Sequence, residues 1–317
     1  MTEVTDAHNA RVRAVGPLLR DAPAPDAADP GYIRVEASGG VAEGVLRFTE
    51  VAPDSPDAVW GALRRHTADV RVAGTEAGIR ASLGGLLDAW LDRVRRVERA
   101  GDGDSSMRLV LPTRDIALAA PLLAKGFAPV GIHAVRQLPR ASAASAPAVP
   151  SELDGAVVRR ATADDADELG RMDAELLELD AHFGGVTLRP GAARTFAGEY
   201  RERLRRAPDT TWVLEREGRL TGLVHVMPDD GDAEPDSPVL AAGGGQCLVV
   251  MYLDPAERGA GTGARLVSLA HDALDAAGTP YTVLSYAVPN PRSGPFWARM
   301  GYRPLVTEWQ RRPALFD

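Results

Sequence analysis

The part of the chain best suited to binding a ligand is an apolar, strand-like run that ends in a glycine-rich turn. The run Cys247–Leu253 is followed by Arg258-Gly259-Ala260-Gly261-Thr262-Gly263, which leads into a helical pattern. The first N–H groups of a helix have no partner within it, and the helix dipole adds positive charge there, so this terminus favours an anion. Gly261 and Gly263 lack the Cβ that would keep a phosphate from the backbone, and Arg258 adds charge.

The glycine spacing and a second block of sequence narrow the choice of anion. The turn has neither the spacing of a P-loop nor that of a dinucleotide fingerprint. Downstream lie the strand-like run Tyr281–Val288, then Asn290-Pro291, then Phe296-Trp297-Ala298-Arg299-Met300-Gly301-Tyr302. Together the two blocks, residues 246–305, resemble the GNAT acyltransferase family, in which an Arg-x-x-Gly-x-Gly turn binds the pyrophosphate of coenzyme A.

The resemblance implies transfer of an acetyl group from acetyl-CoA to an amine, with no metal. A backbone N–H near Leu253 would polarise the thioester carbonyl, and the pantetheine arm would lie along this strand. Asn290 is either a contact to that arm or a plain Asn-Pro turn. The residues expected to bind the cofactor are Leu253, Arg258, Gly259, Ala260, Gly261, Thr262, Gly263, Asn290, Ser293 and Trp297.

Trp297 departs from the pattern of the family. Many members carry at this position a tyrosine that protonates the departing thiolate, and an indole N–H is no useful acid. Either the thiolate leaves unaided or another group donates the proton, and Ser293 is a candidate, or else an ordinary helix-start residue. Trp297 itself is expected to pack in the core or against the cofactor.

The general base has no clear signature, because Cys247–Leu253 contains no Asp or Glu. Tyr252, His225 and Asp180 are the residues we expect around the acceptor. His225 is equally compatible with an interior position, and charges near Asp180 are ordinarily those of a solvated helix face. A water relay would leave no mark in the sequence.

The chain of 317 residues suits two domains. We expect an α/β fold (an α+β mixed sheet) of two tandem GNAT-like domains, 1–140 and 155–317, joined by a small-residue and proline-rich linker at 141–154. Lys125–Val130 parallels Met300–Leu305, which suggests an internal duplication. The first domain lacks the cofactor turn, since Ala73–Gly78 offers no equivalent and Glu76 would repel pyrophosphate, so we expect it to be degenerate and non-catalytic.

Periodicity and turn signals predict the elements that position these motifs. In the first half we expect strands at 32–37, 45–51, 70–72, 107–111 and 132–138, and helices around 83–94 and 116–124. In the second half we expect strands at 157–161, 211–216, 220–227, 247–253, 281–288 and 302–309. Helices are expected at 164–179 with Thr162 or Asp164 as the cap, at 191–206, after Gly263, and at 293–300. Residues 231–245 read as a long loop.

Composition limits the class of protein. The net charge of -8 argues against nucleic-acid binding and mildly favours a cationic small molecule, here an amine. With one cysteine, Cys247, no secretory leader and no long apolar span, we expect a cytoplasmic monomer or homodimer without membrane contact. Abundant alanine and arginine suggest a GC-rich bacterium.

Three functional hypotheses remain open. The first is an acyl-CoA-dependent N-acetyltransferase that acts on a small amine by direct attack in a ternary complex. The second is a non-catalytic sensor or accessory protein that binds acyl-CoA, which Trp297 and the missing strand carboxylate favour. The third is an acetyltransferase similar to mycothiol synthase. This hypothesis is disfavoured because the acidic and histidine residues, at the spacing typical of the last motif of that enzyme, are missing here.

Overall fold

The computed structural model describes residues 3–137, 152–207, 210–229, 240 and 243–317. The chain divides into two compact units. The first unit contains residues 1–133, 231–242 and 304–317, and the second contains 134–230 and 243–303. Most of the predicted linker and of the predicted loop at 231–245 lies outside the described residues. No helix of the described part is both long and apolar enough to span a membrane.

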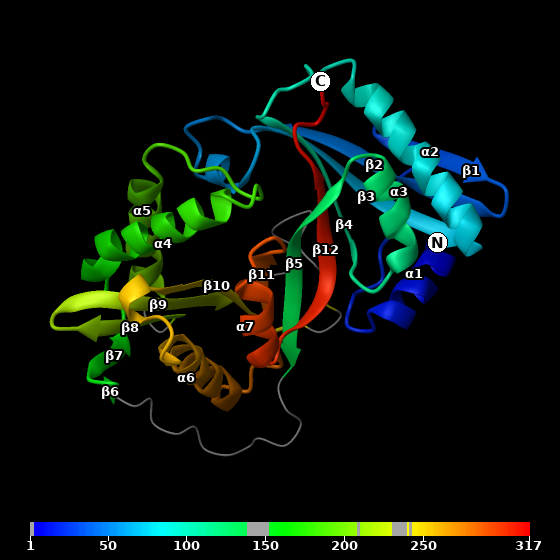
Figure 1. Cartoon of the computed structure of the whole chain (residues 1–317). Helices are drawn as coiled ribbons and strands as arrows, with labels where there is room; N and C mark the ends of the chain where they lie inside the picture. The colour runs from blue at the N-terminus through cyan, green and yellow to red at the C-terminus, as the bar shows by residue number, and fades with distance from the viewer. Residues whose placement is uncertain (1–2, 138–151, 208–209, 230–239, 241–242) are drawn as a thin grey trace. The chain divides into compact units, whose positions relative to one another are not determined.

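The first unit is built on a sheet in the order β1-β2-β3-β4-β12 (Figure 1). Strands β1, β2 and β3 pair antiparallel, β3 and β4 pair parallel, and β4 pairs antiparallel with β12. Its elements are α1 (Glu3–Val15), β1 (Tyr32–Ala37), β2 (Gly40–Glu50), β3 (Arg64–Gly74), α2 (Glu76–Val94), β4 (Ser105–Pro112), α3 (Ala119–Ala124) and β12 (Arg303–Arg311). Strand β5 (Ala128–Gln137) contains the point in the sequence at which the first unit ends and the second begins.

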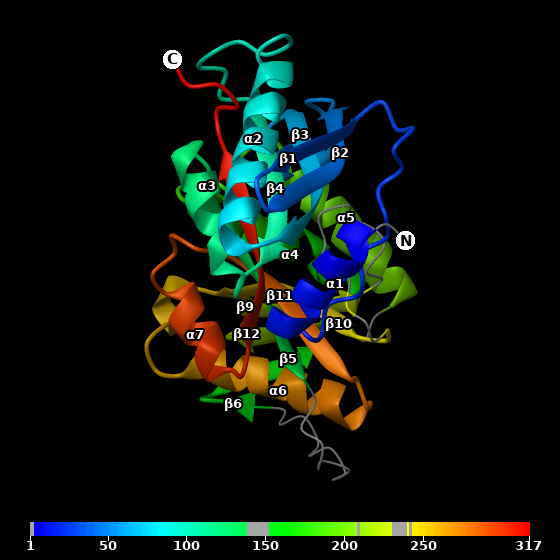
Figure 2. The ribbon, with the colours of Figure 1, turned by 90° about the vertical axis from the view of Figure 1, so that its right-hand side faces the viewer.

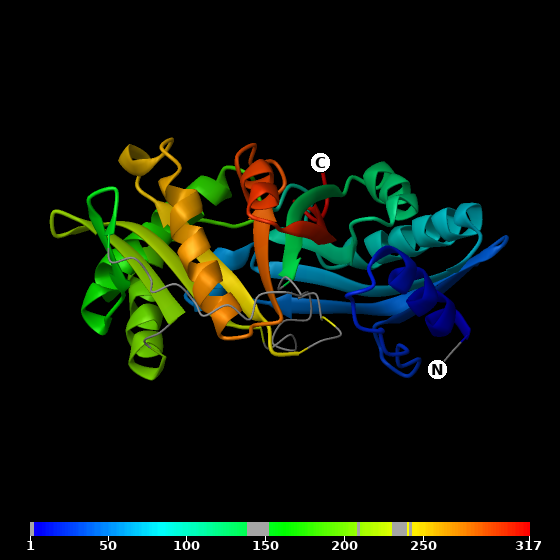
Figure 3. The same cartoon turned by 90° about the horizontal axis from the view of Figure 1, so that it is seen from below.

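Helix α2 supplies most of the core on one face of this sheet. Thr75 caps it, accepting a hydrogen bond from the N–H of Gly78 at 3.2 Å. Leu83, Leu86, Leu87, Trp90, Leu91 and Val94 recur at helical spacing, and all are buried. Figure 2 shows α2 in front of the strands. Helix α1, which the sequence analysis does not predict, lies on the opposite face, against β3 (Figure 3).

The second unit has a mixed sheet in the order β11-β10-β9-β8-β7-β6. Helices α4 and α5 cover one face and α6 covers the other (Figure 1). The elements are β6 (Glu152–Leu153), β7 (Ala156–Arg160), α4 (Ala166–Ala181), α5 (Ala192–Arg206), β8 (Thr211–Arg216), β9 (Arg219–Pro228), β10 (Gln246–Leu253), α6 (Thr262–Ala276), β11 (Tyr281–Ala287) and α7 (Ser293–Arg299). Thr162 and Asp165 form a capping box before α4, in agreement with the predicted cap.

The compact units differ from the predicted domains at the end of the chain. The sequence analysis places residues 302–309 in the C-terminal domain, whereas residues 304–317 belong to the first unit. Strand β12 pairs there with β4 from Val306↔Pro112 to Arg311↔Met107. Strand partners are chosen by packing between distant segments, so a local pattern predicts a strand and leaves its sheet neighbour open.

Candidate functional site

The two parallel strands β10 and β11 separate soon after they begin. Their pairing is confined to Gln246↔Thr282 and Cys247↔Val283. On its other edge β10 stays paired with β9 as far as Leu253, with a bulge between Leu248 and Val250. From Leu248 onward, the edge of β10 that faces β11 therefore lines a gap instead of a ladder.

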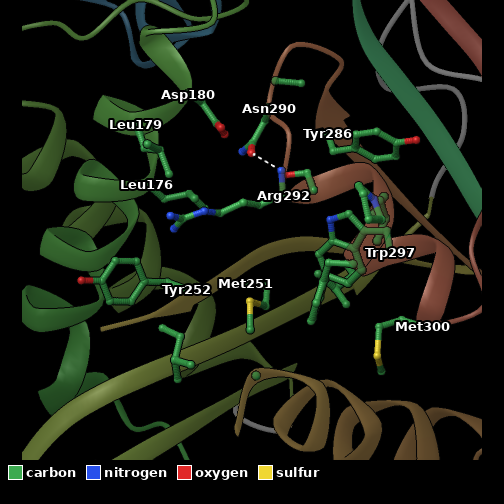
Figure 4. Close-up of a pocket in the computed structure, with 18 of the residues that line it drawn as sticks. Leu176, Leu179, Asp180, Met251, Tyr252, Tyr286, Asn290, Arg292, Trp297 and Met300 are labelled. Atoms are coloured by element: carbon green, nitrogen blue, oxygen red, sulfur yellow. Dashed lines mark hydrogen bonds between the residues drawn. The ribbon is translucent and has the colours of Figure 1, made fainter. Parts of the chain in front are cut away.

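A cavity of about 1060 Å³ occupies this gap. Its walls come from the ends of β10 and β11, the turn before α6, the segment from Asn290 through α7, and the last turns of α4 (Figure 4). Of the residues predicted to form the site, those that line the cavity are Asp180, Tyr252, Leu253, Arg258, Gly259, Gly261, Gly263, Asn290, Ser293 and Trp297. Ala260, Thr262 and His225 are not among the lining residues.

The turn before α6 is open on the side of the cavity. Gly259 and Gly261 have φ angles of 100° and 84°, a region that favours glycine, and a Cβ at either position would meet no atom within 4 Å. Arg258 folds back and its Nε donates to the carbonyl oxygen of Leu253 at 2.8 Å. No side chain caps α6, and its first turn contains no acidic residue, so its terminal N–H groups keep their preference for an anion.

Gly263 has a role in packing that the sequence analysis misses. A Cβ at this position would lie 2.9 Å from the terminal methyl of Met251, a side chain of β10. The glycine therefore lets the first turn of α6 approach the strand, in addition to lining the cavity. Thr262 is buried in the same turn, and Ala260 is exposed.

The segment after β11 forms a tight turn. The side-chain Oδ1 of Asn290 accepts a hydrogen bond from the backbone N–H of Arg292 at 3.1 Å. This bond supports the turn interpretation of Asn290, and a cofactor contact stays a prediction. Ser293 begins α7 beside it and lines the cavity.

Trp297 is both a core residue and part of the cavity wall. It is 8% exposed, and its ring lies edge-on to Phe296 at 4.8 Å and to Tyr302 at 5.5 Å. Such edge-to-face pairs fix the ring position. The structure therefore holds the indole in place of the phenol that many relatives have, and it offers no acid at this position.

The wall contributed by α4 carries Asp180, the one carboxylate among the described lining residues. Leu176, Leu179 and Asp180 of α4 and the following Phe183 line the cavity. Burial raises the pKa of the Asp180 carboxyl to about 6. Figure 4 shows this carboxylate directed into the cavity.

Tyr252 contributes its ring to the cavity, while its hydroxyl turns toward α4. The hydroxyl donates a hydrogen bond to Glu175 Oε2 at 2.5 Å, and Arg171 pairs with the same carboxylate. Burial and this bond raise the pKa of the phenol to about 12. Glu175 lies outside the cavity lining and contacts the site only through Tyr252.

His225 is an interior histidine. It is 1% exposed, between β8 and α5, with Nδ1 2.8 Å from the Thr211 hydroxyl and Nε2 3.5 Å from Arg203. Burial, and secondly the Arg203 charge, lowers the pKa of the imidazole to about 4. The structure therefore does not bring His225 to the cavity, and the interior interpretation holds.

The first unit repeats the arrangement of strands but fills the corresponding gap with its own chain. Strands β3 and β4 pair only over residues 64–67 and 105–108. Helix α1 packs against β3, where His8 Nδ1 accepts from the N–H of Val72 at 3.2 Å. Arg11 forms a two-pronged ion pair with Asp115, just after β4. A side chain of the protein thus accepts a hydrogen bond from a strand N–H in the first unit.

Helix α2 also differs from α6 at its start. Thr75 caps α2, and the backbone of Gly39 and Gly40 lies so close that a Cβ on Gly78 would come within 2.2 Å of Gly39. These contacts satisfy and cover the terminus of α2, whereas that of α6 is open.

Comparisons with known proteins agree with the fold. Residues 207–304 match the family model described as acetyltransferase (GNAT) domain. A GCN5-related N-acetyltransferase from Sphaerobacter thermophilus superimposes with a TM-score of 0.52 at 13% identity, covering 88% of this chain and 82% of that one. The glucosamine N-acetyltransferase region of a fungal multi-domain GH3 β-N-acetylglucosaminidase gives a TM-score of 0.50 at 13% identity, covering 86% of this chain and 31% of that one.

A tandem GNAT protein from the clavulanic acid biosynthesis pathway gives a TM-score of 0.44 at 13% identity, covering 98% of this chain and 96% of that one. No curated protein matches the chain. The two solved structures with TM-scores of 0.52 and 0.50 share the fold, a mixed sheet flanked by helices, and the family match covers the turn, β10, β11 and α7. The chain contains a GNAT acetyltransferase domain and is an acyltransferase of this class.

Proposed function

We propose that the second unit transfers an acetyl group from acetyl-CoA to the amine of a small molecule, by direct attack in a ternary complex. The separation of β10 and β11, with an open glycine turn and an ionisable carboxylate around one cavity, is the observation that carries this proposal. The turn suits a pyrophosphate, and the unpaired edge of β10 suits an amide-containing arm that bonds to it like an added strand.

Different groups of the cavity contribute to different steps of acyl transfer. The thioester of bound acetyl-CoA supplies the activated acyl group. A backbone N–H near Leu253, at the end of β10, donates to the carbonyl oxygen as negative charge develops there. Arg258 fixes this end of the strand through its bond to the Leu253 carbonyl.

Asp180 is the residue we propose as general base. A carboxylate whose pKa lies near 6 is ionised at neutral pH and still basic enough to accept a proton from the ammonium group of the acceptor, directly or through water, which frees the amine for attack. The thiolate leaves without an acid from Trp297, because a thiol with a pKa of about 8.5 is a good leaving group near neutral pH.

We further propose that each chain has one cofactor site. His8 and Arg11 of α1 close the gap of the first unit, and the hairpin backbone at Gly39 and Gly40 covers the start of α2. A chain that binds acyl-CoA without transfer is the second candidate, and Trp297 in the place of an acid favours it.

Calorimetric titration with acetyl-CoA, followed by turnover of an amine panel, tests the proposal. We expect one acetyl-CoA per chain and turnover of some amine. The double variant Arg258→Glu/Gly261→Val should weaken binding by about 100-fold or more, which is about 2.7 kcal/mol. The matched control Arg206→Glu/Gly278→Val changes an exposed arginine and another positive-φ glycine away from the cavity, and it should bind normally.

Two acetyl-CoA molecules per chain would refute the assignment of a closed first unit. Unchanged affinity in the Arg258→Glu/Gly261→Val variant would refute the assignment of the turn. Tight binding without turnover of any amine would favour the non-catalytic candidate.

A further inference from the structure

We infer that the acceptor is an amino acid with an apolar side chain, whose ammonium group pairs with Asp180 and whose carboxylate pairs with Arg292. This inference rests on the proposed function and adds the chemical class of the substrate. It is carried by two side chains of opposite charge on facing walls of one cavity, neither of which has a partner of its own among the described residues.

Arg292 reaches across the cavity from the segment after β11. Figure 4 shows its side chain extended toward α4, with the guanidinium between Asp180 and Tyr252. The bond from its backbone N–H to Asn290 fixes the start of that side chain. Within the parts of the chain that the structure describes, no carboxylate lies within ion-pair distance of it, whereas Arg171 on α4 pairs with both Glu168 and Glu175.

The direction of Arg292 assigns it to the acceptor and not to the cofactor phosphates. The turn at residues 258–263 and the start of α6 form the anion site of the cavity. Arg292 points instead toward α4, where the cavity is walled by Asp180 and the ring of Tyr252 (Figure 4). A guanidinium binds a carboxylate through two parallel hydrogen bonds, a geometry that fixes orientation as well as position.

Asp180 is the complementary charge. It is half-buried, and no hydrogen bond or ion pair to its side-chain carboxylate occurs among the described residues. An uncompensated charge in a partly desolvated wall is costly, and a ligand cation removes that cost. An amino acid presents an ammonium and a carboxylate on one carbon, so a single small molecule satisfies both Asp180 and Arg292.

The rest of the acceptor wall is apolar. Leu176, Leu179 and Phe183 are three, four and seven residues apart, so they share one face of α4 and its extension. Leu179 is 41% exposed, which leaves apolar area for a ligand to cover. This face suits the side chain of leucine or phenylalanine.

The reaction balances with these groups and solvent. The ammonium group first gives one proton to Asp180, which passes it to solvent, and the free amine nitrogen then bonds to the carbonyl carbon of the thioester as the C–S bond breaks and the electron pair leaves on sulfur. The second proton from nitrogen passes to Asp180 and ends on the thiolate, which gives an N-acetyl amino acid and the free thiol. Pairing with Asp180 before the transfer places the amine beside its own base.

Matched acceptors separate recognition of the carboxylate from recognition of the amine. Leucine and leucinamide share the side chain and the amine, and only leucine carries the negative charge; phenylalanine and phenylalaninamide form a second pair. We expect kcat/KM of the wild-type protein to favour the amino acid over its amide by about 10-fold or more, as for a charge-assisted pair. Arg292→Gln should remove the preference, and Arg292→Lys should restore part of it.

The control variant is Arg299→Gln, which removes another exposed arginine of the same cavity and should leave the preference unchanged. A wild-type preference for the amides overturns the inference. So does an Arg292→Gln variant that loses affinity for acetyl-CoA while keeping the wild-type preference, because the guanidinium then serves the cofactor.

Calorimetry distinguishes failure of this inference from failure of the proposed function. Leucine, phenylalanine and their amides are titrated into protein saturated with coenzyme A. Binding of the amino acids that Arg292→Gln abolishes supports the inference even if no acceptor is acetylated, which would refute acetyl transfer alone. Absence of amino acid binding in the saturated protein overturns the inference whatever amine is turned over.

Discussion

The hydroxyl of Tyr252 donates a 2.5 Å hydrogen bond to Glu175, which ties the end of β10 to helix α4. Arg171 holds the other side of the same carboxylate. Burial and this hydrogen bond raise the pKa of the phenol to about 12, so the hydroxyl of Tyr252 is protonated at neutral pH and acts as the donor to Glu175. Its geometry is that of a positioning residue, which sets the distance between the strand that would bind the thioester and the helix that carries Asp180.

We therefore expect Tyr252→Phe to raise KM for the acceptor and to lower kcat by less than about 10-fold. A group that transfers a proton in the reaction contributes about 10²–10⁴-fold to the rate, so a positioning role and a proton-transfer role predict clearly different losses of kcat. Steady-state kinetics at saturating acetyl-CoA measure the effects on kcat and on KM separately. Glu175→Gln keeps an acceptor for the phenol and serves as the milder comparison. A loss of kcat of about 10³-fold in Tyr252→Phe, with an unchanged KM, would contradict the positioning role.

The pKa of Asp180 predicts the acid limb of the pH profile. Burial raises this pKa to about 6, so the carboxyl is protonated below that pH and available as a base above it. We expect kcat/KM to rise with pH through about 6. Asp180→Asn should lower kcat by about 10²-fold or more and abolish that limb. Glu178→Gln, an exposed carboxylate of the same helix outside the cavity lining, is the matched control.

The same profile can refute the assignment. An Asp180→Asn variant that keeps both its rate and an inflection near pH 6 would show that another group titrates. Measuring the profile with an acceptor amide of low amine pKa separates ionisation of the protein from ionisation of the substrate, because the inflection of the enzyme stays in place.

The cofactor side of the cavity is predictable because its signals are local. A strand, a glycine turn and a helix are consecutive in sequence, so their contacts follow from spacing, and the open conformations of Gly259 and Gly261 follow from residue type. The cap at Thr162 is local in the same way. The turn at Asn290 is also a short-range feature.

The acceptor side depends on packing between distant segments. Arg292 is an ordinary polar residue in sequence, and only the fold brings it to the cavity wall. Glu175 is connected to the cavity indirectly, because it accepts the hydrogen bond of the lining residue Tyr252. Helix α1 escapes prediction for another reason. Its buried face includes Thr5, His8 and Asn9, so the usual apolar stripe is absent. The partner of β12 likewise follows from sheet pairing and not from its own residues.

A buried carboxyl behind the cavity gives a separate prediction about stability. Asp173 of α4 is 8% exposed and accepts a hydrogen bond from the Tyr200 hydroxyl at 3.2 Å. Burial raises the pKa of Asp173 to about 7, well above the value of about 3.9 expected in an unfolded chain. Between these two pH values the folded protein binds a proton that the unfolded protein has lost, so this carboxyl stabilises the fold less as the pH rises through that window.

Asp173→Asn replaces the carboxyl by a neutral group of the same shape that can still accept from Tyr200. We expect the variant to unfold at a similar urea concentration to the wild type at pH 4 and to be more stable at pH 8, by roughly 2–4 kcal/mol at most. The buried histidines, including His225, lose their stabilising neutral form on acidification in both proteins. The difference between variant and wild type therefore isolates Asp173. A difference that is constant from pH 4 to pH 8, or larger at pH 4, would show that its pKa is not raised by folding.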